Sequence, residues 1–381
     1  MSPADKILQK ALVGSGLDTR GWSTVQAGLR DRAFFSSQVT EAKILHAMRQ
    51  NVAELVKEGK SPSEVRRDLR AYLGSIGYDP DKGLKPGERS RHGTIKDLNS
   101  KARLDVMMKT NADQAKGYAS HLRATTTGAI LAFPAYELVR VERRKLPRDW
   151  SARWASAAQK VGWEGVARSG GMIALKTSPI WAALSRFGNP FPPFDFNSGM
   201  GIRDVSKSRC REIGLLGADE QPKIPQPPDF NGNLTAQVPM RNDDPEAKRL
   251  KDIFGDQIRF DGDTVHWQGE LIQDVLSGKA KKANLGIGFD GSKLSLSHQF
   301  FIEHGGKHLD PNEPYAHLTK QEFELLPSLW RKPDRILKTR DPNRTQLELD
   351  TLDGGSIVAI VDKRNGLKSI QKRISPGGSV T

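Results

Sequence analysis

The chain contains a single cysteine, Cys210, in 381 residues. An intramolecular disulfide is therefore excluded, and so is a zinc site built from several cysteines. The sequence has no run of about 18 apolar residues, the length that a membrane-spanning helix needs, and its first residues, MSPADKILQKALVGSG, lack the apolar core of a signal peptide. These absences predict a protein that is made in a reducing compartment, that is kept there or exported from it inside a larger particle, and that has no membrane partner.

Motifs for nucleotide and metal chemistry are also scarce. No P-loop lysine motif and no HExxH motif occurs, which argues against a P-loop ATPase and against a zinc site of the HExxH type. The stretch 286–291 matches a dinucleotide fingerprint, but no βαβ unit surrounds it, so a turn-rich loop is expected. His304 and His308 have the spacing of a zinc pair, but two glycines between them should end a helix. Cys210 has no neighbouring histidine that could activate it as a nucleophile. We therefore expect neither metal nor cofactor.

What the chain does have is positive charge, and its distribution is uneven. The net charge is +14. Residues 1–241 hold 38 lysines and arginines against 24 acidic residues, whereas residues 242–381 hold 21 of each. A basic surface needs no partner to be stable in water, but it also attracts a polyanion such as DNA. The basic excess of the first part therefore makes a nucleic acid a candidate partner.

The sequence predicts a multi-domain protein with a Pro-rich linker. Residues 1–217 are expected to be mainly α, because apolar residues from Ile44 to Val56 recur every three or four positions and Ser61–Glu64 forms a capping box. Residues 218–244 are rich in proline and poor in apolar residues, as a linker is. Residues 245–381 are expected to form an α+β domain.

Four strand-like runs at the end of the chain predict a four-stranded antiparallel sheet. Asp353-Gly354 and Asn365-Gly366 are strong hairpin signals between these runs. Upstream, Ser295 is expected to open a helix that ends at the glycines 305 and 306. The predicted strands are Arg335–Thr339, Gln346–Thr351, Ser356–Arg364 and Leu367–Ile374.

Residues 178–200 read SPIWAALSRFGNPFPPFDFNSGM and include Pro190, Pro192 and Pro193 among five aromatic residues. Proline disfavours a helix interior or a central strand, so a rigid loop packed on aromatic rings is expected. On physical grounds alone, such a loop could equally serve only as a structural plug. With DVS and GLLG between Asp204 and Gly217, the stretch resembles the C-terminal signature of phage head-morphogenesis proteins of the Mu F-like minor head class. This resemblance covers residues 90–217. It implies a virion protein that acts in capsid assembly, with the portal or the major capsid protein, or both, as its partner and with packaged DNA as a candidate partner of the basic first part.

The second domain resembles nucleases of the barnase–EndoU–colicin–RelE type, of which phage-encoded versions lie behind head-morphogenesis domains. The resemblance covers residues 285–375 and includes the words LSLSHQFFIEHGGKH, PYAHLTKQEFELLPSLWRKPDRI, LELDT and SIVAIVDKRNGLKSI. It implies RNA cleavage without a metal, which needs a base, an acid and cations for the phosphorane charge. The candidate catalytic residues are His304, His308, His317, Lys363, Ser369 and Lys372, and the candidate phosphate-binding residues are Arg340, Arg344 and Arg373.

Two other interpretations remain open at this stage. The whole chain is also compatible with a toxin delivered by the virion, in which the first part serves only for packaging. A purely structural head protein with an inactive nuclease fold is the other alternative. The residues alone do not decide whether the protein is an enzyme, because a histidine or lysine in these positions is as compatible with a solvated surface.

Overall fold

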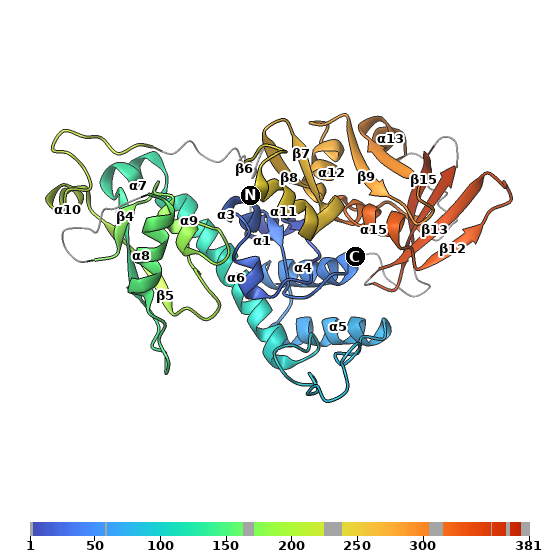
Figure 1. Ribbon diagram of the computed structural model, residues 1–381, viewed down its shortest axis with the longest axis horizontal. Helices are drawn as coiled ribbons and strands as arrows, with labels where there is room; N and C mark the ends of the chain where they lie inside the picture. The colour runs from blue at the N-terminus through green and yellow to red at the C-terminus, as the bar shows by residue number, and fades with distance from the viewer. Residues whose placement is uncertain are drawn as a thin grey trace. The chain divides into compact units, whose positions relative to one another are not determined.

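The chain divides into two units, and neither is continuous in sequence. The first comprises residues 1–9, 17–32 and 51–237, and the second comprises residues 10–16, 33–50 and 238–381 (Figure 1). The computed structural model describes residues 3–57, 59–162, 171–224, 238–304, 315–351, 353–362 and 366–374. The sequence predicts residues 1–217 as one domain. The structure instead includes residues 10–16 and 33–50 in the second unit. Much of the predicted linker, residues 225–237, lies outside the described residues.

The first unit combines helices with a small antiparallel sheet. Its sheet has the order β4-β3-β5. The capping box at the start of α5 is confirmed, because Ser61 accepts from the Glu64 amide and the Glu64 carboxylate accepts from the Ser61 amide. The elements are α1 (Pro3–Leu8), α2 (Thr19–Trp22), α3 (Ala27–Asp31), α5 (Pro62–Ser75), α6 (Lys101–Ala124), α7 (Thr127–Ala132), β3 (Ala135–Arg140), α8 (Trp150–Lys160), β4 (Ile173–Leu175), α9 (Ile180–Leu184), β5 (Met200–Val205) and α10 (Lys207–Glu212).

The aromatic stretch 178–200 forms part of the core of the first unit. Trp181 and Phe194 are fully buried and stack on each other with ring centroids 5.9 Å apart. The Trp181 ring also meets Trp154 of α8 edge-on at 5.2 Å and Tyr136 of β3 at 5.8 Å. Edge-to-face packing of this kind stabilises beyond the buried area alone. The expected packing of this stretch on aromatic rings is therefore confirmed, but residues 180–184 form the helix α9 and not a loop.

The second unit is an α+β assembly around a five-stranded sheet of order β11-β15-β14-β13-β12, in which every neighbouring pair is antiparallel. The four strands predicted from sequence are confirmed as β12 to β15 (Figure 1). The short strand β11 adds a fifth at the edge. The strands of this sheet are β11 (Tyr315–Ala316), β12 (Arg335–Lys338), β13 (Arg344–Asp350), β14 (Ser356–Asp362) and β15 (Gly366–Arg373).

The helix predicted to start at Ser295 is wrong in its first part. Ser295 lies in β10, which pairs with β9 as a hairpin, and the helix begins only at His298. The amide of Phe300 donates to the side chain of Ser297, so the capping serine lies two positions later than expected. The other elements are β1 (Ala11–Leu12), β2 (Ala33–Phe34), α4 (Ala42–Val56), β6 (Val238–Pro239), α11 (Pro245–Phe254), η1 (Gly255–Gln257), β7 (Ile258–Asp261), β8 (Thr264–Trp267), α12 (Gln268–Leu276), β9 (Lys282–Ile287), β10 (Lys293–Ser297), α13 (His298–His304), α14 (Lys320–Phe323) and α15 (Leu326–Arg331).

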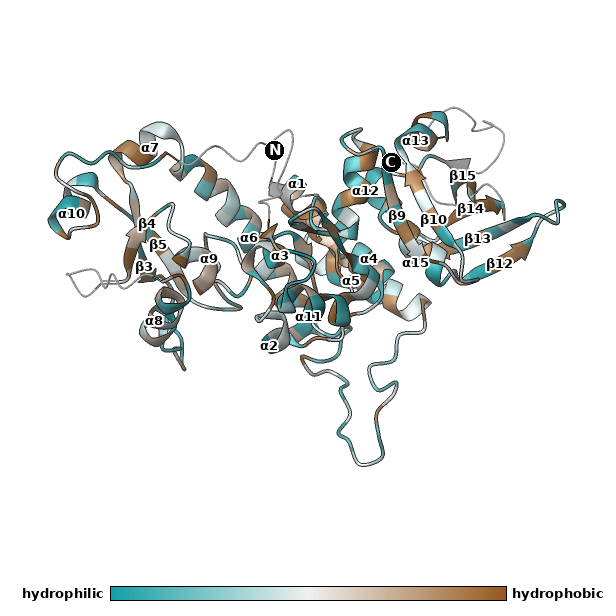
Figure 2. Ribbon diagram, turned by 45° about the horizontal axis from the view of Figure 1, so that its top comes forward, coloured by the Kyte–Doolittle hydropathy of each residue, from teal (hydrophilic) through white to brown (hydrophobic). Residues whose placement is uncertain are grey.

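One face of the large sheet carries the core of the second unit. Leu347, Leu349, Ile357 and Ala359 belong to one buried cluster with residues of α12 and α15. Successive side chains of a strand point to opposite faces, and Figure 2 shows hydrophobic and hydrophilic residues mixed along these strands. The polar residues between the core positions therefore lie on the opposite face of the sheet.

The N-terminal segments of the second unit are bound to it by buried polar contacts. The Gln257 side chain donates to the Gly14 carbonyl at 2.7 Å and accepts from the Gly14 amide at 2.8 Å. On α4, Arg49 is fully buried and its Nη1 lies 2.8 Å from a Glu324 carboxylate oxygen. A buried charge needs its partner far more than an exposed one does. The second unit is consequently complete only with residues 10–16 and 33–50.

His46, one turn before Arg49 on α4, predicts a pH dependence of stability. It is 7% exposed, and its Nδ1 has no hydrogen-bond partner in the described part of the chain. Burial lowers the pKa of His46 to about 3, aided by the charges of Arg49 and Lys372 and opposed by Asp353. Below about pH 6.5 the unfolded chain thus binds a proton that the folded chain does not.

We therefore expect the free energy of unfolding to fall as the pH falls from 6.5 towards 3, by about 2 kcal/mol between pH 6.5 and 5 from this group alone. Urea unfolding of the wild-type chain and of a His46→Gln variant across this range measures it. The variant should lose less stability on acidification than the wild type. Parallel pH curves for the two proteins would contradict the prediction.

Candidate active site

The candidate site lies on the polar face of the large sheet in the second unit. Leu347 and Leu349 point into the core, so their neighbours Gln346, Glu348 and Asp350 point to the other face of β13. The strand register places Arg335 of β12 directly opposite Glu348. This row of polar side chains comes from a strand in the middle of the sheet and has a strand on each side.

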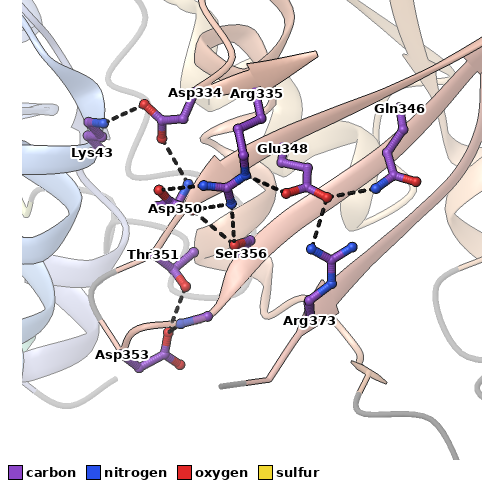
Figure 3. Close-up of polar contacts among 11 residues, drawn as sticks. Lys43, Asp334, Arg335, Gln346, Glu348, Asp350, Thr351, Asp353, Ser356 and Arg373 are labelled. Carbon is purple, nitrogen blue, oxygen red and sulfur yellow. Dashed lines mark hydrogen bonds and ion pairs between the residues drawn. The ribbon is translucent and has the colours of Figure 1, made fainter. Parts of the chain in front are cut away.

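Glu348 is the centre of this face, with 1% of its side chain exposed. It accepts hydrogen bonds from Arg335 Nε at 2.6 Å and from Gln346 Nε2 at 2.6 Å, and Arg373 Nη1 lies 2.9 Å away (Figure 3). Burial alone would raise the pKa of Glu348, but the hydrogen bonds from Arg335 and Gln346 and the charge of Arg373 outweigh it. The pKa lies below its ordinary value, so the carboxylate is ionised at neutral pH.

Arg335 binds two carboxylates at once. Besides Glu348, it reaches both oxygens of Asp350, at 2.6 and 3.1 Å, and its Nη2 donates to the Ser356 hydroxyl at 3.1 Å. The hydrogen bonds to Asp350 and Glu348 raise the pKa of Arg335 above its ordinary value. Arg335 and Arg373 stay partly open to solvent, with 42% and 37% of their side chains exposed. Guanidinium groups placed in this way can meet an incoming phosphate oxygen.

The structure brings only part of the predicted set to this face. Arg373 is in contact with Glu348. Ser369 lies on the same face of β15, four residues before Arg373. Lys372 points to the opposite face, where it forms ion pairs with Glu322 at 2.6 Å and Asp353 at 2.5 Å. Burial would lower the pKa of Lys372, but these two partners raise it above its ordinary value. Lys372 is thus a charged residue fixed by ion pairs, on the other side of the sheet from Glu348.

The two other predicted arginines lie near the hairpin that joins β12 and β13. Arg344 begins β13 and forms ion pairs with Asp341 at 3.2 Å and Asp362 at 3.7 Å. It shares the face of Gln346 and Glu348, because all three occupy alternate positions of the strand. Arg340 is exposed in the hairpin. These arginines extend the basic character of the face beyond Gln346.

The structure gives less information about the positions of the predicted histidines and Lys363 than about those of the arginines. His304 is the last residue of α13, and His317 is exposed after β11. His308 and Lys363 lie outside the described residues. His298 of α13 directs its Nδ1 to the Val275 carbonyl at 2.7 Å, which marks it as a residue that fastens the helix to α12.

Sequence reasoning missed Glu348 and Arg335. A glutamate between two leucines in a strand is typical of an ordinary solvated surface position. Only the strand register shows that arginines of two different strands converge on it. The alternation in RTQLELD could have identified the face, but the partners of Glu348 come from 13 and 25 positions away in the chain.

No family model, curated protein or solved structure matches the chain. The site is therefore judged by its geometry. Among the residues that the structure describes, no three histidine, cysteine, aspartate or glutamate side chains gather in a way that could hold a metal ion. Within the same ranges, no helix has the length and apolar character needed to cross a bilayer.

The arrangement provides two of the three functions that phosphodiester transfer needs. An ionised carboxylate can accept a proton from a hydroxyl group. The two guanidinium groups beside it can stabilise negative charge on phosphoryl oxygens. An acid for the leaving group is not among the side chains that contact Glu348.

Proposed function

We propose that the chain is a phage minor head protein whose second unit is an endoribonuclease that works without a metal ion. The observation that supports the catalytic part most is the ionised Glu348 held between Arg335 and Arg373 on the polar face of an antiparallel sheet. Glu348 accepts from side chains of three strands, β12, β13 and β15. A carboxylate that only formed an ion pair with one arginine would not need so many donors.

In this mechanism Glu348 is the general base. It takes the proton of a ribose 2′-hydroxyl, and the 2′-oxygen forms a bond to the adjacent phosphorus. The bond from phosphorus to the 5′-oxygen breaks, and the 5′-oxygen takes a proton from an acid. Arg335 and Arg373 stabilise the charge that develops on the non-bridging oxygens. His317, or a histidine of the stretch 304–308, is the candidate acid, since histidine titrates near neutral pH.

The role in the head rests on the resemblance of residues 178–200 and on the way this stretch packs. A loop fixed by Trp181 and Phe194 presents its surface without losing conformational entropy on binding. That property suits assembly on the portal or on the inner capsid. The proposed location is the virion, and packaged DNA is the proposed partner of the basic first unit.

Loss of Glu348 as a base should abolish most RNA cleavage. In the full chain, with a chelator present, Glu348→Gln is expected to cleave an RNA oligonucleotide about 10²- to 10⁴-fold more slowly than the wild type. The matched control is Glu246→Gln on α11, which removes a partly exposed carboxylate paired with Arg249 and should leave the rate unchanged. Single-turnover cleavage followed by gel electrophoresis provides the measurement.

A second variant separates chemistry from folding. Arg373→Lys keeps the positive charge beside Glu348 but removes the planar fork, so it should fold and yet cleave at least about tenfold more slowly. Substitution of His317, or of His304 and His308 together, by alanine tests the acid. If a folded wild-type chain leaves RNA intact, or if Glu348→Gln and Arg373→Lys both cleave like the wild type, the ribonuclease proposal is wrong.

Phage genetics tests the head role independently. A phage that lacks the chain should fail to form complete heads, whereas one that carries Glu348→Gln should assemble normally. If heads form normally without the chain, the delivered-toxin alternative is favoured. If a phage that carries Glu348→Gln infects like the wild type, the structural alternative is favoured.

A further inference from the structure

A pocket of about 400 Å³ in the first unit is lined by basic side chains. It lies between α8, α9 and the start of the aromatic loop, and α3 contributes to its wall. Five cationic side chains and one carboxylate line it: Arg30, Arg148, Arg153, Lys160, Arg186 and Asp195. The balance of charge in the pocket is therefore strongly positive.

The single carboxylate is shared among three arginines. Asp195 has 2% of its side chain exposed, and its oxygens lie 2.6 Å from Arg153 Nη1, 2.9 Å from Arg186 Nε and 3.6 Å from Arg148 Nε. One negative charge cannot neutralise three guanidinium groups. The pocket thus keeps surplus positive charge even before Arg30 and Lys160 are counted.

Arg30 is the most unusual member of the set. It comes from α3, is 7% exposed, and donates through Nη1 to the backbone carbonyls of Ser185 and Arg186. Its Nε is buried and has no acceptor among the described residues. Burial and the charge of Arg186 lower the pKa of Arg30 to about 10. An arginine buried without a carboxylate is costly unless an anion completes its surroundings.

A second pocket of the first unit provides a comparison. It has a similar volume, about 390 Å³, and its wall mixes three cationic side chains with three carboxylates: Lys109, Lys116, Arg144, Asp113, Glu142 and Asp195. Cations and anions balance there. The excess of positive charge is thus a property of the pocket that contains Arg30, and it is not found in the second pocket of this basic unit.

We propose that this pocket binds the terminal phosphate of a nucleic-acid strand. A phosphate monoester carries close to two negative charges and several acceptor oxygens, which matches several guanidinium forks at one point. The volume is sufficient for a nucleotide-sized group. The phosphates along the backbone of a duplex could contact only the rim residues Arg148 and Lys160. The phosphate at the end of a strand can enter the pocket and reach the buried guanidinium of Arg30. The basic excess of this part of the chain adds non-specific attraction for the rest of the strand.

The test is the binding of a fluorescent single-stranded DNA oligonucleotide to the full chain, followed by anisotropy. DNA lacks the 2′-hydroxyl, so the proposed ribonuclease reaction does not consume it. The 5′-phosphorylated strand should bind at least about tenfold more tightly than the same strand with a 5′-hydroxyl. A nucleoside 5′-monophosphate should compete for the phosphorylated strand, and inorganic phosphate should compete more weakly.

Variants locate the site. Lys160→Glu changes an exposed rim residue and should remove most of the preference for the 5′-phosphate, and Arg30→Gln should do the same if the protein remains folded. The matched control, Lys116→Glu, changes the balanced pocket and should leave the preference unchanged. Equal affinity for the two strands, tighter binding of an aspartate-rich peptide than of the phosphorylated strand, or a preference that survives Lys160→Glu would overturn the proposal.

Discussion

Replacing Arg49 by methionine is expected to destabilise the second unit by about 3–5 kcal/mol. Arg49 is completely buried; its Nη1 donates to the Lys10 carbonyl at 2.6 Å and to a Glu324 carboxylate oxygen at 2.8 Å. Glu324 is buried too, and its other oxygen accepts from Gln273 at 2.5 Å. Burial already raises the pKa of Glu324, while the charge of Arg49 works against that rise. Without the arginine, a carboxylate remains in the core with no opposite charge.

Thermal and urea unfolding, with hydrogen exchange to assign the loss to the second unit, measure this effect. The matched control is Lys43→Met on the same helix, because the Lys43–Asp334 pair is partly open to solvent and such pairs contribute about 1 kcal/mol or less. The double variant Arg49→Met/Glu324→Gln should recover much of the lost stability, since it no longer buries a charge. Equal losses for Arg49→Met and Lys43→Met would contradict the prediction.

The same pair predicts that the C-terminal part does not fold stably by itself. A fragment of residues 238–381 has Glu324 but neither Arg49 nor the Gly14 backbone that binds Gln257. We expect this fragment to show greater hydrogen exchange in α12 and α14 than the full chain. For that reason the cleavage assays above use the full chain.

Substitution of Gly188 by alanine is expected to be the most damaging small change in the first unit, at about 3 kcal/mol or more. Gly188 has a φ of +82°, and a Cβ there would lie 2.0 Å from the Ala27 carbonyl oxygen. Gly117 of α6 makes a second close approach, since its Cβ would lie 1.9 Å from the Pro192 carbonyl oxygen. Both contacts join backbone to backbone, so no side chain can move aside. The aromatic loop would have to shift.

The matched control is Gly74→Ala at the end of α5, where a Cβ would meet nothing within 4 Å. That change should be neutral or stabilise the chain by up to about 1 kcal/mol, because alanine favours a helix. Tryptophan fluorescence follows the unfolding, since Trp154 and Trp181 lie beside the loop. If Gly188→Ala unfolds at the same urea concentration as Gly74→Ala, the close contact is not a constraint on the fold.

Local signals predicted much of the secondary structure. The capping box at Ser61 marks the start of α5, and alternation with Asp353-Gly354 locates β13 and β14. Such features depend on residues a few positions apart, which a single sequence displays. The β9–β10 hairpin was missed because LSLSHQ offers serine caps as well as alternation, and tertiary packing of Leu294 and Leu296 decided in favour of a strand.

Long-range pairing could not be predicted in the same way. The parallel pair β1–β2 and the Arg49–Glu324 contact join residues whose own neighbours carry no sign of their partners. Of the candidate site, Arg373 was predicted, whereas Glu348 and Arg335 depend on the register of three strands. Register is set by which face is buried and by the turns, so a site of this kind emerges only when the whole sheet is assembled.

The division of the second unit between the two ends of the chain has a consequence for synthesis on the ribosome. Residues 10–16 and 33–50 emerge first, but β15 and its Arg373 emerge last. Domains generally fold as their segments become available, so this unit cannot be completed before β15 has been synthesised. A nascent or prematurely terminated chain that lacks β15 has no Arg373 beside Glu348. The side chains around Glu348 therefore come together only after β15 has been synthesised.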